Sequence, residues 1–426
     1  MKQFPVMAAA AIVAAAAVAG CGGKTSAPEQ QTPQFVTVGD DGQFYRGDSV
    51  YRFRGTNFWY GPILASDGPG GDYDRLVAEL DSLKAMGITN LRVLAGAEGP
   101  DSTLHHISPV LQPEPGVYNE DLLKGLDRFI AELEKRDMTA VIYLTNAWEW
   151  SGGYGSYLQW TGHGPCPDPA DGYNEYVDHV AQFVLDTAAT NLYLNHVRNM
   201  VGRTNSVTGK PYSQSPAIMA WQVANEPRAF SEEGKNALAH WIRRTAREIK
   251  AIDTNHLVST GSEGSVGCQL DLDLWKRIHM FPEIDYAIIH LWPTNWGWAR
   301  RDSSDADLKY AIQYSGEYIT EHLEAIKPHR KPLVIEEFGY PRAGFSFDIN
   351  AAVDSRDEYY RYIIERFEKE PGIGGFNFWG WNGFGRPQHQ TWQPGDPFLC
   401  DPAHEPQGMY GVFSCDSSTI AILRGK

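Results

Sequence analysis

The sequence contains few cysteines and no surplus of positive charge. Its 426 residues include five cysteines, and 37 Lys and Arg stand against 53 Asp and Glu, which leaves a net charge of −16. Nucleic acids and anionic membrane surfaces attract basic proteins, so this balance argues against both as partners. A CxxC pair, an EF-hand loop and a GxGxxG stretch that opens a helix are all missing. The sequence therefore lacks the motifs of zinc, EF-hand calcium and dinucleotide sites.

Long hydrophobic runs are also rare, and the one at the N-terminus is short. Residues 4–20 form an alanine-rich apolar run of 17 residues behind Lys2 and lead into the sequence VAGC. Such a run is typical of an export signal and is too short and too weakly hydrophobic to span a membrane. The ending resembles a bacterial lipobox. We therefore expect residues 1–20 to be a lipoprotein signal peptide, Cys21 to carry the lipid, and residues 21–34 to form a flexible tether.

An ordinary signal peptide with an accidental cysteine is the alternative. With the lipobox, the protein would be exported and held to a bacterial membrane only through its lipid, with its body in water. An exported compartment is oxidising and permits disulfides. The other cysteines allow three pairings, between which the sequence does not decide; Cys400 with Cys415 is the most local, and Cys166 and Cys268 complete the set.

Aromatic residues, in contrast, are plentiful. The chain has 13 Trp, 21 Tyr and 18 Phe, together 12% of its residues. Core packing accounts for most of them, but indoles in an acidic protein also suit a ligand with hydroxyls and flat apolar faces.

From residue 35 to residue 426 the chain alternates short apolar runs with amphipathic stretches. The predicted strands are 53–58, 88–95, 138–145, 218–224, 256–260, 285–290, 332–337 and 373–379. The predicted helices are 73–86, 120–137, 173–200, 234–252, 271–279, 306–327 and 354–369. Strands that alternate with helices predict an α/β fold, a single (β/α)8 TIM barrel with long βα loops, and a doubly wound open sheet is the alternative. Residues 35–52 predict a β-hairpin on the barrel floor, and residues 385–426 are a C-terminal extension that matches no motif.

In a TIM barrel, functional residues stand at the carboxyl ends of the strands. Glu226 follows the fourth predicted strand and Glu337 ends the seventh, so the two carboxylates are expected to face each other across the barrel mouth. Hydrolysis of a glycosidic bond with retention needs such a pair, one acid and one nucleophile, about 5–5.5 Å apart. Glu336 is the rival of Glu337. Because strand residues alternate sides, only one of the two is expected to face the mouth.

The residues around these two glutamates carry a family resemblance. WQVANEP, which contains Glu226, and VIEEFG, which contains Glu337, resemble the two signatures of glycoside hydrolase family 5, in particular of its endo-β-1,4-mannanase branch. The stretches GTNFWYG, NLRVLAG, YLTNAWEWSGGYGSYLQWTG and FNFWGWNG extend the likeness over about residues 35–385. A lone NEP is a weak signal, but NEP and EFG about a hundred residues apart form a strong one.

The resemblance implies a role for each matching residue. Glu226 would be the general acid/base and Glu337 the nucleophile, with Arg92 bonded to Glu337 so that its positive charge lowers the carboxyl pKa. Asn225 would hold the substrate 2-hydroxyl, and His290 would line the site. Many relatives have a tyrosine two residues after that histidine. Here the residue is Trp292, which has no phenolic hydroxyl to donate to the nucleophile.

Several indoles are candidates for sugar contacts. Trp379 matches the platform on which the sugar stacks at the cleavage point. Trp148 and Trp59 stand at other strand ends and are further candidates for substrate binding, together with Asn146. Core packing is about as probable for Trp148 and Trp59.

The resemblance implies a retaining endo-β-1,4-mannanase that acts on mannan, galactomannan or glucomannan as a monomer and needs no metal or organic cofactor. An endo-β-1,4-glucanase shares the catalytic frame, and an exo-acting β-mannosidase or mannobiohydrolase differs only in a loop that blocks one end of the cleft. A lipid-anchored glycan-binding protein without activity is the alternative of another class. The presence of both Glu226 and Glu337 argues against it, because binding alone does not require two opposed carboxylates.

Overall fold

The structure is a computed structural model that describes residue 1 and residues 34–103, 105–300 and 304–425. The chain divides into a unit of residues Met1–Pro33 and a unit of residues Gln34–Lys426. The predicted signal peptide, Cys21 and the predicted tether thus lie, except for Met1 and Gln34, outside the described residues. Within the described part, no helix is both long and apolar enough to cross a membrane.

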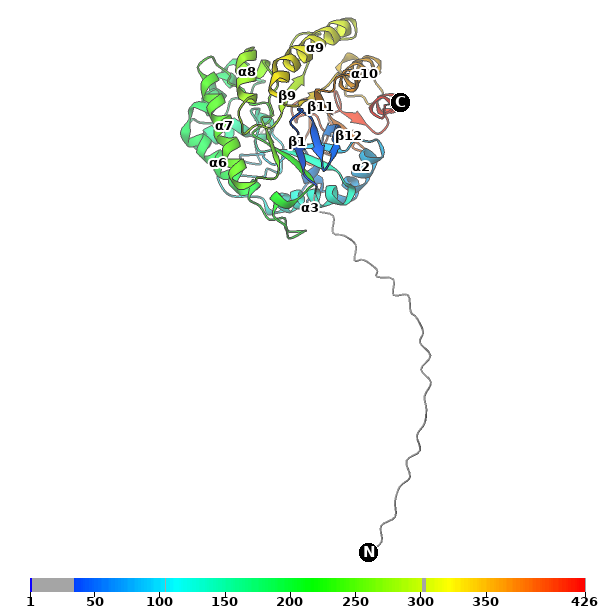
Figure 1. Cartoon of the computed structure of the whole chain (residues 1–426). Coiled ribbons are helices and arrows are strands. Elements are labelled where there is room, and N and C mark those ends of the chain that lie inside the picture. Colours follow the sequence, from blue (N-terminus) through cyan, green and yellow to red (C-terminus); the bar gives the residue numbers. More distant parts are fainter. Residues whose placement is uncertain (2–33, 104, 301–303, 426) are drawn as a thin grey trace. The chain divides into compact units, whose positions relative to one another are not determined.

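Eight parallel strands form the barrel, as predicted (Figure 1). They are β4 (Phe53–Asn57), β5 (Asn90–Leu94), β6 (Thr139–Tyr143), β7 (Ile218–Gln222), β8 (Leu257–Ser259), β9 (Ala287–Leu291), β10 (Leu333–Phe338) and β11 (Ile373–Phe378). Their spatial order is β8-β7-β6-β5-β4-β11-β10-β9. The two outer strands meet where Asp285 N donates to Val258 O at 2.8 Å. Both faces of the sheet are buried, which explains why the strands are continuous apolar runs.

Helices surround the strands (Figure 1). The larger ones are α2 (Tyr73–Ala85), α3 (Glu120–Arg136), α6 (Thr187–Val201), α7 (Gly234–Ile252), α8 (Leu272–His279), α9 (Ser304–Ile326) and α10 (Asp354–Lys369). The predicted helix 173–200 is two helices, α5 (Tyr173–Val180) and α6, because residues 181–186 between them include a short 3-10 turn. In α3 the Asn119 side chain caps the first turn, and one face with Leu126 and Phe129 is buried.

Two further short helices lie in the βα loops. These are α1 (Gly61–Leu64) after β4 and α4 (Gly153–Trp160) after β6. At the other end, β1 (Val36–Val38), β2 (Phe44–Arg46) and β3 (Ser49–Val50) form a small antiparallel sheet. Val36 and Phe44 pack in one apolar cluster with Met219 and Ile288 of the barrel strands. The predicted hairpin thus has a third strand and covers the interior of the barrel, as expected.

The C-terminal extension packs against the barrel. It contains β13 (Val412–Phe413), which pairs with β12 (Trp381–Gly383), and α11 (Ser417–Leu423), which lies against α10. Asp416 forms buried ion pairs with Arg342 and Arg356. A Cβ at Gly380 would lie 1.8 Å from Cys400 Sγ, so only glycine allows this close approach.

The described cysteines do not pair with one another. All four are free thiols: Cys166, Cys268, Cys400 and Cys415. The disulfide pairings that the sequence allowed, including Cys400 with Cys415, are therefore not formed. Cys400 is fully buried and its sulfur lies against the Asn57 carbonyl, whereas Cys415 is exposed.

Candidate active site

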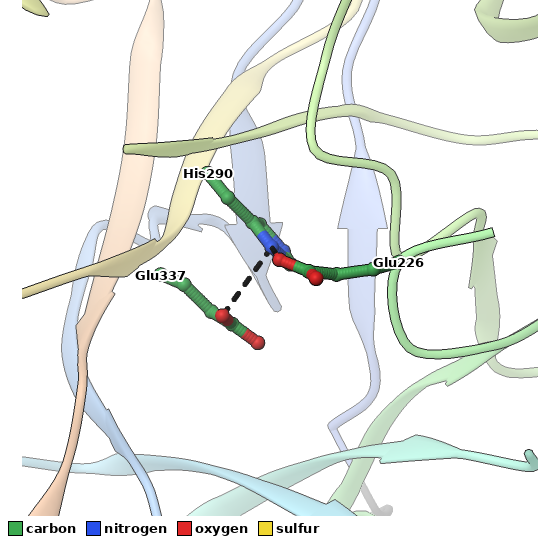
Figure 2. A group of neighbouring side chains, drawn as sticks. All are labelled: Glu226, His290 and Glu337. Atoms are coloured by element: carbon green, nitrogen blue, oxygen red, sulfur yellow. Dashed lines mark hydrogen bonds and ion pairs between the residues drawn. The ribbon is translucent and has the colours of Figure 1, made fainter. Parts of the chain in front are cut away.

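Two glutamates and a histidine meet at the carboxyl ends of three strands. Figure 2 shows His290, from β9, between Glu226, which follows β7, and Glu337, near the end of β10. The His290 Nδ1 atom lies 2.8 Å from Glu226 Oε1 and 3.4 Å from Glu337 Oε2. One oxygen of each carboxylate and one nitrogen of the histidine all lie within 4.8 Å of one another. The sequence prediction that Glu226 and Glu337 face each other therefore agrees with their positions.

The turn after β7 holds Glu226 in an unusual backbone conformation. Its φ is 48°, in the left-handed region that residues with a Cβ adopt rarely and at a cost of about 1–3 kcal/mol. Neighbouring loops fix this turn, because Asn225 N donates to Thr145 O at 2.7 Å and Glu226 N donates to Gly261 O at 2.9 Å. The carboxylate is thereby directed at His290.

Arg92, on β5, joins both halves of the site. Its Nη1 atom lies 2.5 Å from Glu337 Oε1, and its Nη2 atom donates to Asn225 Oδ1 at 2.8 Å. The Asn225 Nδ2 atom donates one hydrogen to Asn146 Oδ1 at 3.1 Å, so its other hydrogen is available for a ligand. Arg92 is fully buried, which means that it supports Glu337 and Asn225 from below rather than contacting substrate.

Trp292 donates a hydrogen bond to Glu337, although it lacks the phenolic hydroxyl that many relatives have at this position. Its Nε1–H donates to Glu337 Oε2 at 3.0 Å. The ring also packs edge-to-face on Trp379 at 5.8 Å and on Tyr410 at 5.2 Å. A Cβ at Gly339 would lie 2.7 Å from the Trp292 ring, so the glycine of the EFG motif makes room for this indole. That role differs from the sharp turn that such a glycine suggests.

Burial controls the protonation of the three groups. Burial raises the pKa of Glu337 to about 7, although the charges of His290 and Arg92 oppose the shift. Arg92 thus lowers this pKa as expected, but burial outweighs its effect. Burial also disfavours the charged form of Glu226, but the hydrogen bond and charge of His290 outweigh burial and lower the pKa of Glu226.

For His290, burial and the neighbouring charges act on the pKa in the opposite directions. Burial alone would lower its pKa, but the surrounding carboxylates of Glu337, Glu226 and Glu336 raise the pKa to about 9. The proton that Glu226 gives up is thus held 2.8 Å away on the histidine.

Glu336 also points into the barrel, which corrects the expectation that strand alternation turns it away. Its carboxylate oxygens accept hydrogen bonds from Gln222 Nε2 at 2.7 and 2.6 Å and lie 3.4 Å from Arg92 Nε. The register between β10 and β9 shifts between Ile335 and Glu337, so Glu336 is an extra residue opposite β9. Such a bulge redirects a side chain, and here it places both glutamates inside.

A cavity of about 1010 Å³ opens above these residues. Glu226, Glu337, Asn225, Trp292, Trp379 and Trp148 all line it. The Trp148 Nε1–H donates to Glu226 Oε2 at 2.5 Å, so this indole both walls the cavity and orients the carboxylate. Side chains from the loops after β6, β7, β8 and β9 continue the wall: Glu149, Asp168, Tyr173, Arg228, Glu263 and Trp296.

Four predicted binding residues do not line the cavity: Arg92 and His290, which contact Glu337 and Glu226 instead, and Trp59 and Asn146. Trp59 is 2% exposed, its Nε1–H donates to Cys400 O at 2.7 Å, and its ring packs on Trp150 and Phe398. Asn146 is fully buried and holds Asn225 in place. The C-terminal extension covers Trp59, and no motif in the sequence indicates where that extension lies.

No motif in the sequence predicts another part of the wall. Pro402, His404, Glu405, Pro406 and Met409 of the C-terminal extension line the cavity. Glu149 is buried, and one of its oxygens lies 3.3 Å from His404 Nδ1. Glu263 is ion-paired with Arg228.

A closed (β/α)8 barrel whose mouth holds two opposed glutamates beneath an aromatic-walled cavity defines a glycoside hydrolase of the two-carboxylate type. Residues 33–426 match the family described as glycoside hydrolase family 5 β-mannosidase-like. The chain therefore belongs to family 5, as its NEP and EFG motifs predict.

Known relatives agree with this assignment. The chain is 28% identical over 346 residues to mannan endo-1,4-β-mannosidase 1 of Arabidopsis thaliana, covering 77% of this chain and 76% of the relative. It is 29% identical over 317 residues to mannan endo-1,4-β-mannosidase 1 of Solanum lycopersicum, with 71% and 74% covered. Among solved structures, the family 5 mannosidase from Rhizomucor miehei superposes with a TM-score of 0.85 at 34% identity, covering 92% of this chain and 97% of that one.

Proposed function

We propose that this protein is a retaining endo-β-1,4-mannanase that cleaves the backbones of mannan-type polysaccharides. The observation that carries the mechanism is the approach of the Glu226 and Glu337 oxygens to within 4.8 Å. Inverting enzymes need about 6.5–9.5 Å between the two carboxyl groups to admit a water molecule, whereas retaining enzymes need about 5–5.5 Å. The relatives named as mannan endo-1,4-β-mannosidases support the choice of substrate.

In this mechanism Glu337 attacks the anomeric carbon, and Glu226 protonates the leaving oxygen. Trp292 and Arg92 donate hydrogen bonds to the two oxygens of Glu337 and hold it in position. The proton for the leaving group passes from His290 to Glu226 along their 2.8 Å hydrogen bond. Water then hydrolyses the glycosyl-enzyme with Glu226 as the base, and the anomeric configuration is retained.

The test follows mannohexaose and cellohexaose with the parent and with Glu337→Ala. The parent should release mid-length mannan products, freshly formed with the β configuration in an NMR time course, and should act much less on cellohexaose. Glu337→Ala should release no reducing ends, while mannan in a native gel should still retard the migration of this variant. Hydrolysis by this variant at the parent rate, or an α product, would refute the mechanism.

Exo action is the second candidate, because the cavity is walled off on one side. No residue of the β4 or β5 ends lines it, and the C-terminal extension stands there instead, with Cys400 above Trp59 and with Pro402 and His404 in the wall. Such a wall would limit the number of sugars that bind on one side of the cleaved bond. Release of only mannose or mannobiose from mannohexaose would favour this reading over endo action.

We also propose that the protein is an exported bacterial lipoprotein anchored through Cys21. The support is in the sequence: Lys2, the apolar run 4–20 and the VAGC ending. Expression of the full chain in a bacterial host, with a radiolabelled fatty acid, should label the parent but not Cys21→Ala. Equal labelling of both, or a signal peptide cleaved elsewhere, would contradict the anchor.

A further inference from the structure

A third carboxylate lies below the two at the barrel mouth. Glu336 is fully buried and is the extra residue of the β10 bulge, and Asn57 Nδ2 fixes its backbone by donating to Glu336 O at 3.0 Å. The side chain of Gln222, on β7, lies between Glu336 and Arg92. Its Nε2 donates to both Glu336 oxygens, and its Oε1 accepts from Arg92 Nε at 2.9 Å.

These contacts form a continuous chain to the reacting carboxylate. Glu336 fixes the amide of Gln222, the amide oxygen fixes the Nε edge of Arg92, and the Nη1 atom of Arg92 meets Glu337 at 2.5 Å. A guanidinium is planar, so holding its Nε edge determines where its Nη atoms point. Glu336 itself does not line the cavity.

Glu336 also adds a third carboxylate to the charged cluster. Two cationic groups, Arg92 and His290, are buried here with Glu226, Glu336 and Glu337. His290 Nε2 has no hydrogen-bond partner in the described part of the chain, and the nearest carboxylate oxygen to it in an ion pair is Glu336 Oε2 at 4.0 Å. Without Glu336, the positive charges would face only Glu226, which gives up and takes a proton in the reaction, and Glu337, which forms the bond to the sugar.

We propose that Glu336 is a positioning residue that aims Arg92 at Glu337 through Gln222, and that its carboxylate, ion-paired with Arg92, sets the pH range of the site. This inference rests on the proposed function, since it concerns the same two glutamates. In this proposal Glu336 acts neither as the nucleophile nor as the acid.

The prediction for pH depends on every charged or titratable group that faces the cluster. These are Arg92 from β5, Tyr143 from β6, Glu226 and Arg228 after β7, Glu263 after β8, Tyr286 just before β9, His290 in β9, Glu337 from β10, and Cys400 of the C-terminal extension. Each remains when Glu336 alone is changed. Loss of one negative charge lowers the pKa of Glu337 and weakens the hold of the Glu226–His290 pair on its proton.

The experiment measures kcat/KM against pH for an aryl β-mannoside. Glu336→Gln keeps the shape and removes the charge. Both limbs of the profile should move to lower pH, by on the order of one pH unit for a charge at this distance, and the maximal kcat/KM should fall roughly tenfold or more. A merely structural role would lower the rate but would leave both limbs in place.

Two matched variants separate charge from position. Glu336→Asp keeps the charge, and Gln222→Met keeps Glu336 but breaks the hydrogen-bonded chain to Arg92. Both should lower kcat/KM while their limbs stay close to the parent positions. Should Glu336→Gln fail to fold, Glu336→Asp still decides, because limbs that move in a variant with the charge retained would overturn the proposal.

The outcome is distinct from a failure of the proposed function. Limbs that do not move in a folded Glu336→Gln variant, with Glu337→Ala inactive, would overturn only the role of Glu336. Hydrolysis by Glu337→Ala would overturn the assignment of the nucleophile, whatever the result for Glu336.

Discussion

The indole of Trp292 donates its N–H to Glu337 Oε2 at 3.0 Å, while Arg92 meets the other oxygen of the same carboxylate. A hydrogen bond to a charged group contributes about 1.5–3 kcal/mol, so Trp292→Phe should lower kcat about 10- to 100-fold. Trp292→Tyr, which retains a donor, should lose less. Steady-state kinetics on an aryl β-mannoside measures this loss of kcat. Because the ring packs on Trp379, thermal melting of each variant checks that it is folded. A Phe variant as active as the parent would exclude this support.

The acid/base role of Glu226 predicts a specific chemical rescue. Glu226→Ala should hydrolyse substrates with poor leaving groups at least 100-fold more slowly, the loss expected for a general acid, but should still form the glycosyl-enzyme from a good aryl leaving group. Added azide should then restore turnover and give β-mannosyl azide, identified by NMR. Rescue of Glu337→Ala should instead give the α azide. The opposite pattern would exchange the roles of the two glutamates.

The pH profile of the parent should be displaced from that of ordinary carboxyl groups. Glu337 must be ionised to attack, and burial raises its pKa to about 7, so activity should fall as the pH drops through about 7. The acid proton is shared with His290, whose pKa the nearby carboxylates raise to about 9, so activity should fall again as the pH rises through about 9. A profile of kcat/KM that stays flat down to pH 5 would contradict the burial of Glu337.

The C-terminal extension depends on a buried ion pair. Asp416→Ala would leave Arg342 and Arg356 buried without their counter-ion, which should lower the free energy of unfolding by about 3–5 kcal/mol. Glu365→Ala is the matched control, because its pair with Lys369 is exposed and should contribute less than about 0.5 kcal/mol. Chemical denaturation measures both. Equal effects of the two changes would show that the extension is not held at Asp416.

Trp59 should affect stability and leave substrate affinity unchanged. Trp59→Ala empties a buried site and removes the hydrogen bond to Cys400 O, which should cost about 3–5 kcal/mol of unfolding free energy. Trp59→Phe should cost less, and both folded variants should keep the parent KM for mannohexaose. A several-fold rise in KM without loss of stability would instead favour the sugar contact that its sequence position suggests.

The sequence predicts the strands, the family and the position of two glutamates at the barrel mouth well, for physical reasons. A strand buried on both faces is a continuous apolar run, so all eight barrel strands could be located within a few residues. Glu226 and Glu337 follow such runs, and the carboxyl ends of parallel strands meet at one barrel mouth. The cysteine pairings could not be decided in this way, because they depend on distances that only the folded chain sets.

By itself, the sequence determined which strands form the barrel and which glutamates stand at its mouth, because both follow from local patterns. Tertiary structure alone decided that Glu336 turns inward, that the indole of Trp292 replaces a phenol as donor to Glu337, and that the extension buries Trp59. Each of these depends on the register of one strand against the next or on a contact between residues far apart in the chain. Such contacts leave no periodic signal in the sequence.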